Sequence, residues 1–79
     1  MSENNISYID YEATGANIKA LMDNNGITTR EMSNILGISF QAVHGYIHGT
    51  RLPTVGHLFM IAKIFDTTVD DLLVPNSYI

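Results

Sequence analysis

The side chains best suited to chemistry lie between Thr28 and Pro53, where hydroxyl, amide, imidazole and guanidinium groups alternate with apolar residues. An amide such as that of Gln41 can pair with adenine N6 and N7, and imidazoles can donate to or accept from base edges. Guanidinium groups, here Arg30 and Arg51, bind phosphate oxygens. These groups have the chemistry to contact nucleic acid, although each of them also occurs on ordinary protein surfaces.

Two short helices joined by a tight turn are expected to position these groups. Thr28 is a suitable N-cap and Glu31 completes a capping box, so a helix is predicted over 29–36. A turn over 37–39 begins with glycine, and a second helix is predicted over 39–48, where another glycine ends it. A glycine-containing turn of three residues between two such helices is typical of a helix-turn-helix.

The second of these helices should present one face to the core and the other to solvent. At 100° per residue, the predicted core face consists of Phe40, Val43, Tyr46 and Ile47. The opposite arc holds Gln41, His44, Gly45 and His48, which are the residues expected to read base edges. Phe40 is added to this set as an alternative, because at the start of the helix it could instead touch a thymine methyl.

The predicted phosphate contacts come from the two helix starts and from the loop after the second helix. The N-terminal amides of a helix form a natural anion site, to which hydroxyls and arginines add donors. The residues are Thr28, Thr29, Arg30, Ser39, Thr50 and Arg51.

Several of these residues also have plainer explanations. The Gln41 side chain could simply be a solvated surface amide. A glycine at position 45 could be a tolerated residue within the helix, with no role in letting the helix backbone approach DNA closely. His44 and His48 are spaced as a helical metal pair, with His57 as a further ligand, but no nearby carboxylate completes a site and there is no His-Glu-x-x-His motif. We therefore predict no metal and no cofactor.

The remaining chain is expected to support this pair of helices. Further helices are predicted over 14–25, from a Thr54 cap to about Phe65, and over 68–73. The predicted division is an N-terminal arm over 1–13, a domain over 14–74 and a tail over 75–79. The arm could be loose or could pack on a partner subunit through Tyr8 and Tyr11. The fold class is all-α, a compact five-helix domain.

Composition narrows the function classes. Seventy-nine residues allow one domain, the apolar runs are too short to span a bilayer, and no signal-peptide pattern is present. The absence of cysteine favours a reducing cytoplasm and, with no phosphate loop or triad, argues against an enzyme. The net charge of −4 opposes nucleic-acid binding, yet residues 32–65 contain no acid and carry both Arg51 and Lys63.

Several spaced motifs together resemble the Xre or Cro/CI type (phage-repressor-like) helix-turn-helix family of bacteria and their viruses, over about Gly15 to Val74. The matching motifs are Gly26-Ile27-Thr28, Met32-Ser33, Leu36-Gly37-Ile38-Ser39, Val43, Gly49-Thr50-Arg51-Leu52-Pro53 and Asp70-Asp71-Leu72-Leu73. The sequence departs from the family at Thr29, where glutamine is usual, and in a second helix that lacks Arg and Lys.

The resemblance implies a sequence-specific, double-stranded-DNA-binding transcriptional regulator, repressor-like, with residues 39–48 as recognition helix. It further implies a homodimer on a two-fold operator, in the cytoplasm, with no small-molecule substrate and no membrane contact. The alternative is a helix-turn-helix kept for protein–protein contact, such as a toxin–antitoxin or regulatory partner subunit. The acidity of the chain and the uncharged second helix favour that alternative.

Overall fold

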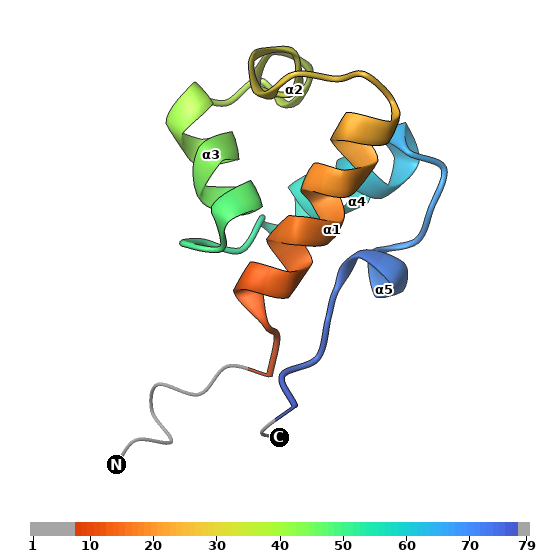
Figure 1. Cartoon of the computed structure of the whole chain (residues 1–79). Helices are drawn as coiled ribbons and strands as arrows, with labels where there is room; N and C mark the ends of the chain where they lie inside the picture. Colours follow the sequence, from red (N-terminus) through yellow and green to blue (C-terminus); the bar gives the residue numbers. More distant parts are fainter. Residues whose placement is uncertain (1–7, 78–79) are drawn as a thin grey trace.

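Five helices and no strand form residues 8–77, the part of the chain that the computed structural model describes (Figure 1). The helices are α1 (Tyr11–Asn24), α2 (Thr29–Leu36), α3 (Phe40–His48), α4 (Val55–Ile64) and α5 (Val69–Leu72). The predicted all-α, five-helix fold is therefore confirmed. No helix within this described part is long and apolar enough to cross a membrane.

Each helix begins at a polar side chain that accepts a hydrogen bond from the third amide of the helix. At α2 the predicted capping box is present: the Glu31 amide donates to Thr28 Oγ1 over 3.1 Å, and the Thr28 amide donates to Glu31 Oε1 over 2.9 Å. Ser39 caps α3 in the same way, and between the two helices Gly37 adopts a φ of 69°. The local sequence therefore sets both ends of the turn.

Helix α1 begins earlier than predicted, at Tyr11 instead of Thr14. Asp10 is the cap, since its Oδ1 accepts from the Ala13 amide at 3.0 Å. The apolar spacing of this stretch gave no sign of the extra turn, whereas an aspartate before it is a valid cap. Residues 1–7 of the predicted arm, and residues 78–79 of the tail, lie outside the described residues.

The chain segments on either side of the helices pair with each other. The Asp10 amide donates to the Val74 carbonyl at 2.7 Å, and the Asn76 amide donates to the Tyr8 carbonyl at 2.8 Å. Val74 in turn donates its amide to the hydroxyl of Thr14, which is fully buried. The two segments thus lie side by side at the N-terminal end of α1 (Figure 1).

A single apolar core joins the helices. It contains Ile18, Met22, Met32, Leu36, Val43, Tyr46, Ile47, Leu58, Ile61, Ala62 and Leu72. Helix α1 crosses α3 at very close range, because a Cβ at Gly15 would collide with the Tyr46 carbonyl. The Tyr46 hydroxyl in turn lies 2.8 Å from His57 Nδ1 of α4. Helix α3 therefore contacts both α1 and α4.

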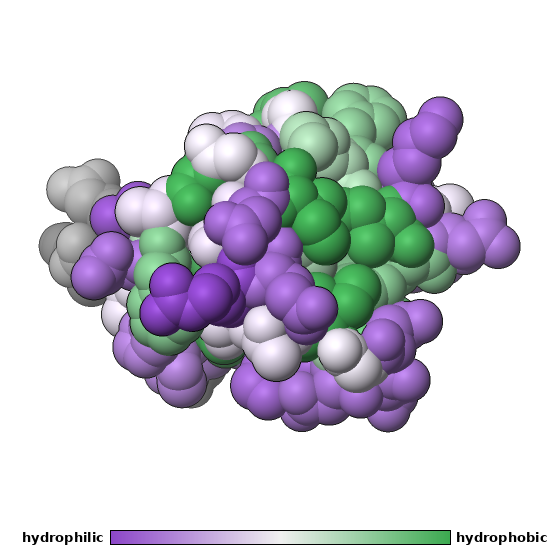
Figure 2. Space-filling view, turned by 90° about the horizontal axis from the view of Figure 1, so that it is seen from above, coloured by the Kyte–Doolittle hydropathy of each residue, from purple (hydrophilic) through white to green (hydrophobic). Residues whose placement is uncertain are grey.

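The fold leaves several large apolar side chains uncovered. Figure 2, which views the molecule from the side on which α2 lies in Figure 1, shows hydrophobic surface gathered between hydrophilic residues. The exposed large hydrophobic residues of the described chain are Tyr8, Tyr11, Ile35, Phe40, Val55, Phe59 and Met60. Three of them, Val55, Phe59 and Met60, belong to α4.

Candidate nucleic-acid interface

The outer face of α3 carries a continuous row of rings. The ring centroids of Phe40 and His44 are 6.4 Å apart, and those of His44 and His48 are 4.1 Å apart. All three side chains are exposed, and so is Gln41 beside the first of them. We call Phe40, Gln41, His44 and His48 the reading ridge. It offers hydrogen-bonding groups and one apolar ring to a groove wide enough for a helix.

Phe40 lies outside the core, contrary to the core-facing arc predicted for it. Its side chain is 42% exposed, while Val43, Tyr46 and Ile47 of the same predicted arc are buried. As the first residue of α3, Phe40 precedes the point at which the helix meets α1. The guanidinium carbon of Arg30 lies 5.8 Å from the ring centroid, a cation–π distance. This contact joins α2 to the start of the ridge.

Gly45 does not lie on the exposed face, and the helical-wheel placement of this residue was wrong. It is buried because the loop after α3 folds back over it: a Cβ here would lie 2.9 Å from Arg51 Cγ and 3.0 Å from Thr50 Oγ1. The amides of Thr50 and Arg51 both donate to the Gly45 carbonyl, at 3.0 and 3.3 Å. Because Gly45 has no side chain, the loop after α3 can pack against it. Arg51 therefore lies at the edge of α3.

The predicted phosphate-contacting residues lie at the ends of α2 and α3. Thr28 and Ser39 cap these helices through their hydroxyls, each of which keeps a proton to donate outward. The amides of the first turn of α2 are only partly available, since Glu31 occupies that of Thr28. Arg30 and Arg51 are exposed, whereas the Thr50 hydroxyl lies 3.4 Å from the Gly45 carbonyl.

Charge is distributed so that the ridge itself is free of acids. Lys19, the one cation of α1, forms an ion pair with Asp23 at 2.6 Å. Three aspartates, at positions 66, 70 and 71, lie in or before α5. The nearest acid in sequence to the ridge is Glu31, whose carboxylate accepts from the Thr28 amide. The two arginines that flank the ridge are therefore its only strong cations within residues 8–77.

The structure brings two of the three histidines together and keeps the third apart. His57 contacts the Tyr46 hydroxyl, between α3 and α4, and does not join the exposed pair. Within residues 8–77, no group of three or more histidine, cysteine or acidic side chains could hold a metal ion. The histidine pair is accordingly better described as part of the ring row.

Sequence analysis identified the members of the ridge but not the row they form. The spacing of Phe40, His44 and His48 by four residues could have indicated it, because such side chains lie above one another on a helix. The cation–π contact from Arg30 had no such signal, since the two residues come from different helices.

The arrangement of α2, a tight turn and an exposed α3 over a common core defines a helix-turn-helix protein. The model of the Cro/C1-type HTH DNA-binding domain matches residues 17–77. The chain belongs to the Cro/C1-type helix-turn-helix DNA-binding domain family.

Individual proteins agree with this assignment. The transcriptional regulator AnsR of Bacillus subtilis (strain 168) is 44% identical over 41 residues, which are 52% of this chain and 35% of AnsR. The matched stretch thus spans about a third of that relative's length.

Solved structures show the same fold. The restriction-modification controller protein C.AhdI of Aeromonas hydrophila superposes with a TM-score of 0.71 at 19% identity, covering 80% of this chain and 96% of that one. SinR, a master regulator for biofilm formation solved in complex with DNA, gives a TM-score of 0.66 at 18% identity, covering 75% of this chain and 95% of that one.

Proposed function

We propose that this protein binds double-stranded DNA sequence-specifically and regulates transcription, with α3 lying in the major groove. The observation that carries the proposal is the reading ridge, which is exposed on the second helix of a Cro/C1-type helix-turn-helix domain. Gln41 pairs with an adenine edge, His44 and His48 contact neighbouring bases, and Phe40 contacts a thymine methyl. Gly45 contributes by seating the loop and makes no base contact.

Phosphate contacts hold the ridge in register. Arg51 and Arg30 bind the backbone on either side of α3, assisted by Thr28, Thr29, Ser39 and Thr50. A homodimer places two ridges on a two-fold operator with half-sites roughly 34 Å apart. Similarity to AnsR supports a role in transcription, which the protein would perform in the cytoplasm by blocking or assisting RNA polymerase.

The test is selection of a duplex from a random-sequence pool, followed by anisotropy titration of the selected site. We expect saturable binding at low salt and a loss of affinity of about fivefold or more for Gln41→Ala, because a bidentate base contact is worth roughly 1–3 kcal/mol. Asn24→Ala, an exposed amide at the far end of α1, is the matched control and should bind as the parent does. The proposal would be refuted if the selection enriches no sequence and the titration shows no saturable binding at protein concentrations below micromolar.

A second candidate function is a protein–protein module, such as one subunit of a toxin–antitoxin or regulatory pair. The net charge of −4 and the absence of Lys and Arg from α3 favour it. A double variant, Gln41→Ala with Arg51→Ala, separates the two functions. If this variant folds but loses DNA, the first candidate holds; if a stoichiometric partner is retained and DNA is never bound, the second holds.

A further inference from the structure

We propose that His44 and His48, here called the histidine pair, take up a proton when α3 enters the major groove and then donate to a guanine. DNA binding therefore strengthens as the pH falls. This inference rests on the proposed function, because it names a base that the reading ridge recognises and makes that recognition depend on pH.

The first observation is the geometry of the pair. His44 and His48 are one helical turn apart on α3, both are exposed, and their ring centroids lie 4.1 Å apart. Neighbouring base pairs in B-DNA are about 3.4 Å apart. The two rings are therefore close enough to contact one base, or two adjacent bases, together.

The second observation is that no described residue occupies the ring nitrogens of the pair. Within residues 8–77 neither side chain forms a hydrogen bond or an ion pair. His57 differs, because its Nδ1 lies 2.8 Å from the Tyr46 hydroxyl. The nitrogens of the histidine pair are thus open to a ligand, whereas His57 has a partner inside the fold.

The third observation is that the two imidazoles are the groups through which α3 can become a cation. The helix contains no lysine, arginine, aspartate or glutamate. Arg30 reaches its first turn from α2, over the Phe40 ring, and Arg51 reaches it from the loop that follows. A positive charge on the helix itself therefore has to come from protonation of the histidine pair.

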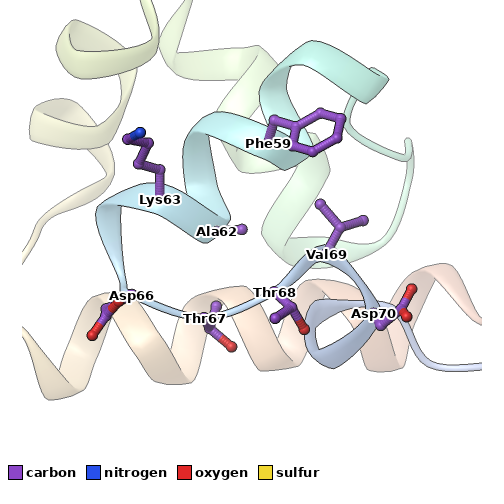
Figure 3. A pocket seen from close by; sticks show the side chains of 8 residues that line it. All are labelled: Phe59, Ala62, Lys63, Asp66, Thr67, Thr68, Val69 and Asp70. Atoms are coloured by element: carbon purple, nitrogen blue, oxygen red, sulfur yellow. The ribbon is translucent and has the colours of Figure 1, made fainter.

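The two lysines of the chain belong to other parts of the surface. Lys19 is paired with Asp23 on α1. Lys63 lines a separate groove of about 580 Å³, together with Asp66 and Asp70, and no residue of α3 lines that groove (Figure 3). Neither lysine takes the place of a cation on the reading ridge.

Two carboxylates lie on the elements packed against α3. Glu12 of α1 lies against Gly49, the residue that follows His48. Glu31 of α2 accepts from the Thr28 amide. Within residues 8–77 neither of them forms an ion pair with a histidine. The partner that stabilises the proton is therefore left to come from the DNA.

Guanine is the base that suits a protonated histidine pair. Its major-groove edge offers two acceptors, N7 and O6, and the usual partner of that edge is a cation, Arg or Lys. An imidazolium donates from both nitrogens, whereas a neutral imidazole donates from one. Adenine offers one acceptor and one donor, which suits Gln41. The recognised site therefore carries a guanine close to the adenine that Gln41 reads.

The pair should take up one proton and not two. Like charges this close disfavour each other, so the first proton opposes the second. Because the bound form holds the extra proton, the logarithm of the association constant falls as the pH rises, with a slope that approaches about −1 per protomer. Histidine changes its charge between about pH 5 and 8, which sets the range of the measurement.

Anisotropy titrations of the duplex selected at pH 6 test the inference from pH 5.5 to 8.5 at constant salt. We expect the affinity of the parent chain to fall by roughly five- to tenfold per pH unit near the middle of this range. The double variant His44→Gln with His48→Gln keeps a donor and an acceptor at both positions but cannot be protonated, so it should lose this dependence. His57→Gln is the matched control and should keep it. Circular dichroism checks that every variant is folded at each pH.

Two further measurements use the parent chain, so they do not depend on whether a variant binds. Titration calorimetry in two buffers of different ionisation enthalpy should count about one proton taken up per protomer. Replacement of the contacted guanine by 7-deazaguanine removes the N7 acceptor. It should weaken binding about fivefold at pH 6 and less at pH 8, where the pair is uncharged.

The inference is overturned if the parent binds its selected duplex equally well at every pH and takes up no proton, or if the double variant keeps the parent's slope. A Glu12→Gln variant that loses the slope would also overturn it, since the proton would then belong to a pair inside the chain. A selected site without guanine contradicts the assigned base. Failure here is distinguishable from failure of the proposed function: binding that is independent of pH retains the function without proton uptake, while no binding at any pH removes both.

Discussion

The Tyr46 hydroxyl and His57 Nδ1, 2.8 Å apart, connect α3 to α4 through the only side-chain hydrogen bond between these two helices within residues 8–77. Tyr46 is 5% exposed, so its hydroxyl has little access to water. The bond therefore helps to fix the rotation of α3 relative to α4.

Tyr46→Phe should therefore cost about 1 kcal/mol of unfolding free energy, the usual net value of one hydrogen bond. In a domain of this size that corresponds to a fall in Tm of roughly 4–8 °C, measurable by thermal circular dichroism. His57→Ala removes the same bond, and the double variant should be little worse than either single one. Fully additive losses would mean that the two residues stabilise the protein independently.

We expect the Phe40 ring to contact a thymine methyl group in the bound DNA. Burying one methyl against its ring is worth roughly 0.8 kcal/mol, so replacing the contacted thymine by deoxyuridine should weaken parent binding about fourfold. The same replacement should not affect Phe40→Ala, whose own affinity is already reduced. Anisotropy titrations of the four combinations form a double-mutant cycle. If deoxyuridine is equally harmful to both proteins at every thymine, Phe40 does not contact a methyl group.

Two helical glycines, Gly15 and Gly56, should respond to alanine in opposite ways. Gly15→Ala places a methyl against the Tyr46 carbonyl and should destabilise the fold by roughly 1–3 kcal/mol, as overpacking does. Gly56→Ala meets no atom within 4 Å and should stabilise a monomeric sample by about 0.5–1 kcal/mol. Chemical unfolding at low micromolar concentration measures both. Equal effects would show that the α1–α3 approach is not tight.

Salt dependence should be shallow for a DNA-binding protein. With Arg30 and Arg51 as the cations beside each ridge, a dimer neutralises about four phosphates, which gives a slope of log K against log salt of roughly −4. Arg51→Ala should reduce that slope by about 2 in a dimer, since each copy loses one contact. Titrations from 50 to 300 mM salt measure it. Lys19→Ala, whose cation is paired with Asp23, is the control and should leave the slope unchanged.

Local signals predicted much of this fold. The starts of α2, α3, α4 and α5 were predicted closely, because each follows a threonine or serine that caps the helix and a cap is a contact between neighbours in sequence. The glycines after α2 and α3 likewise marked where those helices end. The start of α1 was predicted three residues too late, at Thr14 instead of Tyr11, because the apolar spacing there is weak. Tertiary contacts were harder to predict: Gly45 is covered by a loop that returns over it, and no periodicity within one helix reveals that. Gln41, His44 and His48 were placed outward, as the structure has them.

The segments that flank the five helices, residues 8–10 and 74–76, are tied to each other and to α1 by hydrogen bonds. Each of Asp10, Val74 and Asn76 donates its amide to the other segment, and the buried Thr14 hydroxyl depends on the C-terminal segment for its contact. Fraying from the N-terminal side therefore releases the C-terminal side at the same moment. We therefore expect the two segments to open as one cooperative unit, together with the first turn of α1, which Asp10 caps.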